Sequence, residues 1–200
     1  NYRLSSENIN ESWVGFHPKQ SVEKIKSLGY KKNSSGYWAD STGKEVQISI
    51  GIVSGWADWI RAGQIISKNL EDIGIRSRVK TQDFGAWFND LQTGEFSGAI
   101  AWAESGANPF PMYEGLMASK NIKPVGEHAG TNWHRFGLSE VDSLVSVFEV
   151  TSDDIMKNKL IYRMQELFIK SAPAIPLFAD PTWGVYLSLI HISEPTRLEP

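Results

Sequence analysis

The chain has 200 residues, 41% of them apolar and 22% charged, which is the composition of an ordinary globular protein with one sizeable core. Its formal net charge of −3 and its scattered Lys and Arg residues leave no basic stripe, so nucleic acid is not an expected partner. The absence of cysteine excludes disulfides, thiolate metal sites and cysteine nucleophiles.

The first residues carry no basic segment followed by an apolar one, and the chain begins at Asn1 rather than at Met. We therefore expect that a signal peptide or lipoprotein anchor was removed or never included. No apolar run approaches the roughly 20 residues that cross a bilayer, so no membrane span is expected.

The first predicted elements are a helix and a hairpin. Apolar residues three apart predict a short helix over 21–29, which a glycine ends. A polar stretch at 36–44 predicts a hairpin, whose return strand at 46–52 carries Val and Ile in strict alternation. This alternation is the strongest strand signal in the chain.

The next segments are predicted to alternate between helix and strand. Apolar residues recur at steps of three and four over 59–73, which predicts a helix buried on one face. Gly74 is expected to end this helix, and a strand is expected at 75–81. A shorter helix follows, marked by Phe84, Trp87, Phe88 and Leu91 and ended by Gly94, and a third strand is expected at 96–102. The resulting order favours an α/β fold with parallel neighbouring strands and right-handed crossovers.

The chain is predicted to become irregular from 103 to 135, where Asn108-Pro109 and Phe110-Pro111 are expected to block helix formation. Loops of this length in a compact domain are usually functional or disordered.

Two helices and a strand are expected after this loop. Ser139 is the predicted N-cap of the first helix, and Ser152 and Asp153 are predicted to start a longer one. Residues 172–178 are interpreted as a buried strand that prolines interrupt.

The segment Leu-Ser-Leu-Ile-His-Ile-Ser-Glu-Pro-Thr-Arg at 187–197 does not continue this pattern. It matches, residue for residue, the conceptual translation of a transposase adapter used in DNA library preparation. The alternative, a genuine short strand and tail, rests only on the turn signal Glu194-Pro195. We therefore expect 1–186 to be natural sequence and 187–200 to be a non-native tail, and His191 plays no part in the functional interpretation.

No catalytic motif is present in the sequence. The nucleophile elbow, the zinc-protease motif, the phosphate-binding loop and the EF-hand pattern are all missing. The histidines at 17, 128 and 134 are too dispersed to indicate a metal site. Asp83 and Asp90 are interpreted as serving a helix N-terminus and an exposed face. We expect no enzyme activity, no metal and no cofactor.

Three tryptophans are predicted to lie near one ligand-binding edge. Trp56 follows a predicted strand and Trp102 ends another, so both are expected at the carboxyl ends of strands, where α/β folds place ligands. Trp133 lies in a third cluster, and the alternative for its ring is to plug the core. Trp59 belongs to the helical stripe and is assigned to the core.

Polar side chains accompany these rings along the chain. Indole rings stack on sugar rings while polar side chains bond the hydroxyl groups, so the pattern favours a sugar site. The predicted ligand-binding residues are Trp56, Trp102, Glu104, Asn108, Trp133, His134 and Arg135.

Six segments carry a resemblance to a known family. They are Lys-Ser-Leu-Gly-Tyr at 26–30, Ser-Gly-Trp-Ala-Asp-Trp at 54–59, Leu-Glu-Asp-Ile-Gly-Ile at 70–75, Asn-Asp-Leu-Gln-Thr-Gly-Glu-Phe at 89–96, Asn-Trp-His-Arg-Phe at 132–136 and Ala-Pro-Ala-Ile-Pro-Leu-Phe at 172–178. Their order and spacing resemble the oligopeptide/oligosaccharide class (family 5) of bacterial extracellular solute-binding proteins of ABC importers. The second and fifth segments are most similar to members that bind β-linked oligosaccharides such as cello-oligosaccharides.

The resemblance implies an α/β fold of the periplasmic-binding-protein-like type II class, as a truncated second lobe with a mixed sheet flanked by helices. It implies a monomer whose two lobes close on an oligosaccharide or peptide ligand and deliver it to the transmembrane subunits of an ABC permease, the first lobe not being included. It also implies a periplasmic or extracellular location, as a cell-surface lipoprotein in a Gram-positive organism.

Alternatives remain open at the level of the sequence. A member of the same class could bind a peptide, a dipeptide or a nickel chelate, although no charged groups that meet peptide termini are identifiable. A lobe of a secreted glycoside hydrolase would use Glu104 with a second carboxylate about 5 to 9 Å away. A sensor domain fused to a regulator is a third possibility.

A lobe cut from its partner is expected to be marginally stable and to bind weakly.

Overall fold

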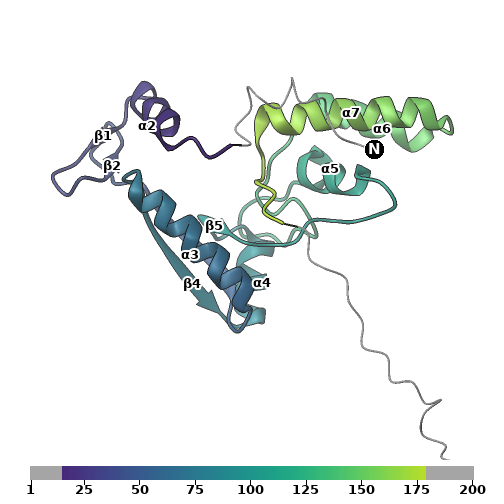
Figure 1. Cartoon of the computed structure of the whole chain (residues 1–200). Coiled ribbons are helices and arrows are strands. Elements are labelled where there is room, and N and C mark those ends of the chain that lie inside the picture. The colour runs from purple at the N-terminus through teal and green to yellow at the C-terminus, as the bar shows by residue number, and fades with distance from the viewer. Residues whose placement is uncertain (1–14, 179–200) are drawn as a thin grey trace, which may run out of the picture.

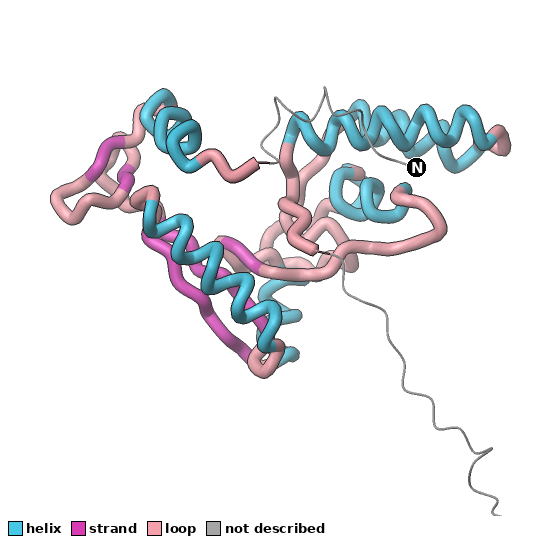
Figure 2. The backbone as a smooth tube through the Cα atoms, viewed as in Figure 1, coloured by secondary structure: helices cyan, strands magenta, loops and turns pink. Residues whose placement is uncertain are grey.

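The computed structural model describes residues 15–178, which pack around two hydrophobic cores (Figure 1). One core belongs to a small parallel sheet with its helices, and the other to a layer of three helices. Long loops connect the two parts (Figure 2). The chain start and the expected non-native tail at 187–200 lie outside the described residues.

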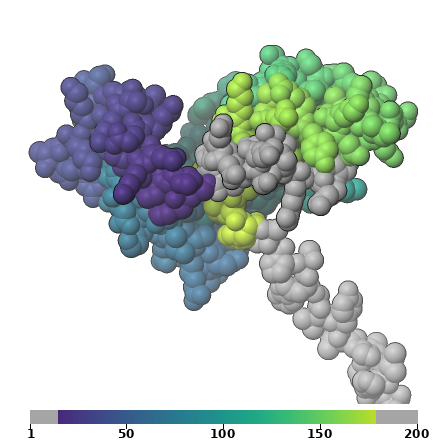
Figure 3. All heavy atoms as spheres, turned by 45° about the horizontal axis from the view of Figure 1, so that its top comes forward, coloured from purple at the N-terminus to yellow at the C-terminus, as the bar shows by residue number. Residues whose placement is uncertain are grey.

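A short helix and a two-stranded hairpin begin the described chain. α2 (Pro18–Ser27) starts with a proline, whose missing N–H would be unpaired in the first turn of a helix anyway. β1 (Lys31–Lys32) pairs antiparallel with β2 (Trp38–Ala39). The helix predicted at 21–29 is confirmed with an earlier start. Figure 3 shows this region and the helical layer at opposite ends of the molecule.

The strand after the hairpin becomes the centre of the main sheet. β3 (Gln47–Val53) has β4 (Arg76–Gln82) on one side and β5 (Gly98–Ala99) on the other, and both pairings are parallel. The last four residues of β3 are buried, as a strand covered on both faces requires. The predicted parallel β-α-β-α-β order is confirmed, although the third strand is much shorter than the predicted 96–102.

The predicted hairpin at 36–44 is present, and its pairing with the segment before β3 is short. An antiparallel bridge joins Ala39 to Glu45, the N–H of Asp40 donates to the carbonyl of Lys44 at 2.9 Å, and the N–H of Val46 donates to the carbonyl of Trp38 at 2.8 Å. From Gln47 onward the strand pairs with β4 instead.

α3 (Ala57–Asp72) lies along one face of the sheet (Figure 1). Its Gly63 comes so close to the sheet that a Cβ atom there would lie 2.3 Å from Ile52 Cδ1. Glycine therefore sets the distance between helix and sheet at this point. The helix predicted at 59–73 is confirmed.

α4 (Phe84–Thr93) begins directly after β4 and packs against β3. Asp83 is its N-cap and accepts the N–H of Ala86 at 3.0 Å, as predicted for this carboxylate. Gly94 ends the helix at φ +75°, a left-handed conformation that glycine adopts without the penalty that a Cβ brings.

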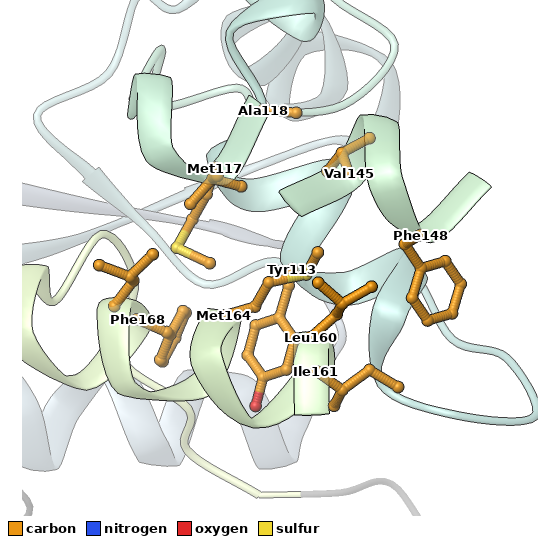
Figure 4. Close-up of a cluster of buried hydrophobic side chains, with 11 residues drawn as sticks. Tyr113, Met117, Ala118, Val145, Phe148, Leu160, Ile161, Met164 and Phe168 are labelled. Carbon is orange, nitrogen blue, oxygen red and sulfur yellow. The ribbon is translucent and has the colours of Figure 1, made fainter. Parts of the chain in front are cut away.

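The second core lies between α5 (Phe110–Met117), α6 (Ser139–Val150) and α7 (Asp154–Ser171), with the short 3-10 helix η1 (Ser119–Asn121) beside them. The side chains that fill it come from all three α-helices (Figure 4). Its largest fully buried members are Met117, Val141, Ile161 and Met164.

The structure corrects two predictions in this part of the chain. Residues 110–117 are helical, because Pro111 lies in the first turn, where backbone N–H groups have no partner within the helix. Residues 172–178 do not form the predicted strand. Pro173 and Pro176 remove two backbone donors, and no neighbouring strand is available among the described residues.

The two C-terminal helices begin close to their predicted positions. Asp153 is the N-cap of α7 and accepts the N–H of Ile155 at 2.8 Å, as expected from the sequence. Leu138, rather than the predicted Ser139, is the N-cap of α6. No helix in the range 15–178 is long and apolar enough to cross a membrane.

Candidate functional site

Seven aromatic rings form one continuous array at the carboxyl end of the parallel sheet. We call it the aromatic array; its members are Trp56, Trp59, Phe84, Trp87, Phe88, Trp102 and Trp133. The strands, helix starts and loop that supply these rings are separate in the chain. The fold therefore gathers all three predicted tryptophans at one place.

Trp56 joins the array from the turn between β3 and α3, as the sequence predicted. It is the N-cap residue of α3, and its ring is partly buried. The ring meets Trp59 edge-on, with centroids 4.7 Å apart and an interplanar angle of 88°. Trp59 is buried in the sheet core, as its assignment to the helical stripe predicted.

Phe84 and Trp102 are the exposed rings of the array, and the partly buried Phe88 lies beside them. Phe84 and Trp102 are 48% and 39% exposed, and their planes differ by only 8°, with centroids 6.5 Å apart. Phe88 is stacked against both, at 18° to Phe84 and 25° to Trp102. These three rings are therefore nearly parallel and offer aromatic surface that solvent can reach.

Trp87 supports this surface from below. It is 1% exposed and contacts five other members of the array. Because α4 begins at the carboxyl end of β4, its first turns place Phe84, Trp87 and Phe88 together at the sheet edge.

Trp133 reaches the array from the loop between η1 and α6. Its ring lies edge-on to Trp102, with centroids 5.5 Å apart and an angle of 89°. Its Nε1 donates to the carbonyl of Ala129 at 3.1 Å, and the side chain packs partly buried against the sheet core. Trp133 thus both fills space beside the core and borders the exposed ring of Trp102.

The predicted polar residues occupy different settings. Glu104 is exposed in the segment that follows Trp102, and its side chain lies against α5, since a Cβ at Gly115 would be 3.3 Å from Glu104 Cγ. Asn108 accepts the N–H of Phe110 at 2.9 Å and so supports the start of α5.

His134 is held by the helical layer. Its Nε2 lies 2.9 Å from the carbonyl oxygen of Leu116, so this nitrogen carries the proton, because a carbonyl can only accept. The ring is also stacked on Phe136. Burial lowers the pKa of His134, more than its hydrogen bond to the Leu116 carbonyl raises it.

This lowered pKa makes stability depend on pH. The folded state disfavours protonation of His134, so its contribution is complete above the ordinary pKa of 6.5 and is lost as the pH falls towards the lower folded value. We expect the urea concentration at the midpoint of unfolding to decrease when the pH is lowered from about 7.5 to about 5.5. The variant His134→Gln should show a smaller fall, because its side chain does not titrate. Equal falls in both proteins would contradict this assignment.

The guanidinium group of Arg135 donates hydrogen bonds to three main-chain carbonyls. Its Nη2 donates to the carbonyls of Gln92 at 2.8 Å and Glu127 at 3.0 Å, and its Nη1 donates to the carbonyl of Trp133. These bonds place Arg135 at the C-terminal end of α4.

Asp83 and Asp90 both accept hydrogen bonds from neighbouring groups. Asp83 caps α4, and Asp90 accepts hydrogen bonds from Gln82 at 2.8 Å and Lys80 at 3.2 Å. These bonds lower the pKa of Asp90, with the Gln82 bond as the larger cause. No cluster of three or more potential metal-ligating side chains occurs within residues 15–178.

Sequence reasoning missed two parts of this region. Phe84 and Phe88 were predicted only as members of a helix, although a helix that starts directly after a parallel strand places its first turn at the ligand edge. A polar pocket of about 240 Å³ between α4 and the sheet was also not predicted; Gly51, Gln82 and Asp90 are among its lining residues.

Comparison with solved structures identifies this architecture. A mannohexaose-bound periplasmic oligopeptide-binding protein of an ABC transporter from Thermotoga maritima superimposes with a TM-score of 0.81 at 23% identity, over 91% of this chain and 34% of that protein. The chain has the fold of a periplasmic-binding-protein lobe. The predicted fold class is therefore confirmed.

Two further structures with this fold carry different ligands. AppA from Bacillus subtilis, an oligopeptide-binding protein in complex with a nonapeptide, has a TM-score of 0.69 at 17% identity, with 81% of this chain and 33% of that one covered. NikZ from Campylobacter jejuni, in complex with Ni(L-His), has a TM-score of 0.68 at 17% identity, covering 80% and 33%.

The chain spans about a third of the length of each of these proteins. No protein-family profile and no curated protein sequence matches it.

Proposed function

We propose that this chain is one wall of the ligand cleft of a solute-binding protein that serves an ABC importer and captures an oligosaccharide. In this proposal, residues 1–186 belong to the second lobe, and 187–200 are a non-native tail. The complete protein closes its two lobes on the ligand outside the cytoplasmic membrane, in the periplasm or at the cell surface, and passes the ligand to a permease. It has no catalytic role.

The observation that carries the proposal is a nearly parallel set of rings at the carboxyl end of the sheet, formed by the exposed Phe84 and Trp102 with the partly buried Phe88 beside them. Apolar C–H faces of sugar rings stack on such surfaces, and this edge of an α/β sheet is where ligands bind. Support also comes from the mannohexaose-bound structure with the same fold. Trp56 and Trp133 border these rings, and Glu104 is an exposed side chain nearby in the sequence that can bond hydroxyl groups.

A peptide ligand is the competing proposal, since AppA carries a nonapeptide on the same fold. Peptide capture relies on groups that meet backbone and terminal charges, whereas the described array presents mostly apolar ring surface. The ring chemistry therefore favours the sugar.

An NMR titration of the indole N–H signals separates the two ligand classes. The chain is titrated with mannohexaose, with cellohexaose and with an uncharged hexapeptide, at concentrations that reach the millimolar range expected for a single wall of a cleft. We expect at least one sugar to shift the signals of Trp56 and Trp102 saturably and to leave Trp38 unchanged, because Trp38 lies in the distant hairpin. Shifts with the peptide alone, or no shift with either sugar, would overturn the proposal.

A further inference from the structure

The loop that carries Trp133 is fixed to both cores of the molecule. Trp133 packs against the sheet core, and Phe136, three residues later, packs against the helical core. Asn132, just before Trp133, and Arg135, just before Phe136, have left-handed backbones with φ values of +51° and +55°, and the N–H of Arg135 donates to the carbonyl of Asn132 at 2.9 Å. The tight turn therefore sets the direction in which the Trp133 ring leaves the chain.

Asn132 fixes this turn to the helical part. It is 2% exposed, and its Nδ2 donates to the carbonyls of Ala118 at 3.2 Å and Phe136 at 2.6 Å. Its Oδ1 accepts the N–H of Phe136 at 2.9 Å. One buried amide thus satisfies three main-chain groups on the α5 and α6 side.

Arg135 fixes the same turn to α4. Its guanidinium bonds three carbonyls at once: Gln92 in the last turn of α4, Glu127 in the preceding loop and Trp133 itself. A cation at the C-terminal end of a helix is also favoured by the helix dipole. The carbonyl of Gln92 additionally accepts the N–H of Ala129, the residue whose own carbonyl holds the Trp133 indole.

Gly94 makes room for this arrangement. A Cβ atom at this position would lie 2.4 Å from Arg135 Cζ and 2.5 Å from its Nη1. Any side chain at 94 would therefore displace the guanidinium from the end of α4. A lysine at 135 could not replace the arginine, because its single ammonium cannot reproduce a planar fork that reaches three acceptors.

We propose that Arg135 is a positioning residue that holds the Trp133 ring edge-on against Trp102 and does not contact the ligand. Its guanidinium hydrogen-bonds both the carbonyl of Trp133 and the carbonyl of Gln92 at the end of α4. The guanidinium can lie there because Gly94 has no Cβ atom. The expected effect on ligand affinity rests on the proposed function, whereas the effect on the Trp133 ring does not.

The test uses the variants Arg135→Lys and Gly94→Ala, read through the indole N–H signals of the eight tryptophans. Both variants are expected to shift the Trp133 and Trp102 signals and to leave Trp38 unchanged, because the Trp38 Nε1 donates to the carbonyl of Ile73 in a distant part of the fold. The control is Gly29→Ala, which carries the same left-handed strain, with φ +88°, but has nothing within 4 Å of the added methyl group.

Affinity for mannohexaose should fall by about two- to twelve-fold in both variants, the equivalent of one edge-to-face aromatic pair. An Arg135→Lys protein that keeps the Trp133 and Trp102 signals of the parent would overturn the proposal, as would a Gly29→Ala protein with the same shifts as Gly94→Ala. If Arg135→Lys loses the dispersed Trp38 signal and so fails to fold, Gly94→Ala decides the matter. If the parent chain binds no sugar, the proposed function fails, and the indole signals still decide the role of Arg135.

Discussion

Replacing Trp102 with alanine is expected to weaken oligosaccharide binding by about 10- to 100-fold, the effect of removing a hot-spot aromatic side chain. The Trp102 side chain is 39% exposed, and its ring contacts four other members of the array. These contacts fix the orientation of the ring, so its exposed part offers a flat surface to a ligand. Its removal also leaves Phe84 and Phe88 without the largest of the three nearly parallel rings.

Titration calorimetry or NMR at several sugar concentrations measures this change. The matched control is Phe16→Ala, because Phe16 is an aromatic side chain that is 74% exposed and makes none of the ring contacts of the array. Binding should be unchanged in the control. Equal affinity of the Trp102→Ala protein and the parent would show that this ring is not part of the ligand wall.

The variant Trp87→Ala is expected to have the largest effect on stability. Trp87 is 1% exposed and packs below the exposed rings, so alanine would leave a cavity that costs about 3 to 5 kcal/mol. This loss is a large part of the about 5 to 15 kcal/mol that folding of a typical domain supplies. A lobe without a partner has little stability to lose, so we expect the variant to be largely unfolded at 37 °C.

Urea unfolding followed by circular dichroism measures the loss. Trp87→Phe is the informative companion, since the Trp87 Nε1 has no hydrogen-bond partner among the described residues and phenylalanine therefore removes volume but no bond. It should cost less than half as much as alanine. The Trp102→Ala protein should lose much less stability than the Trp87→Ala protein. The reverse order would contradict the assignment of Trp87 to support and Trp102 to ligand contact.

Sequence patterns predicted the sheet part of the fold well because its signals are local. The alternation in 46–52, the long helical stripe after it and the glycines at 74 and 94 each depend on near neighbours in the chain. The N-cap roles of Asp83 and Asp153 are local in the same way. The order strand, helix, strand by itself favours parallel pairing of the strands, so the sheet could be predicted from these local patterns.

Other features depend on distant contacts or on exact position in an element. The helix at 110–117 was missed because a proline blocks a helix interior but not its first turn. The strand expected at 172–178 had the right apolar composition, but pairing needs a neighbour that no local pattern reveals. Pairing similarly limits β5 to two residues.

The sequence predicted which tryptophans lie in the candidate site, but it did not predict how the aromatic rings are arranged there. Strand ends indicated Trp56 and Trp102, but the stacking of Phe84 and Phe88 beside Trp102 depends on how α4 packs against the sheet. The role of Arg135 was equally hidden, because its partners Gln92 and Glu127 are main-chain carbonyls, which leave no trace in the sequence.

The most direct test of the oligosaccharide wall is to locate the sugar on the chain. Nuclear Overhauser effects are measured between the C–H protons of mannohexaose and the aromatic protons of the chain, with the ring protons of Trp102 assigned through the Trp102→Ala variant. We predict contacts to Trp102 and Phe84, with upfield shifts of the sugar protons that lie over the rings. Contacts to Phe96, which lines the polar pocket, without contacts to Trp102 or Phe84 would contradict the account.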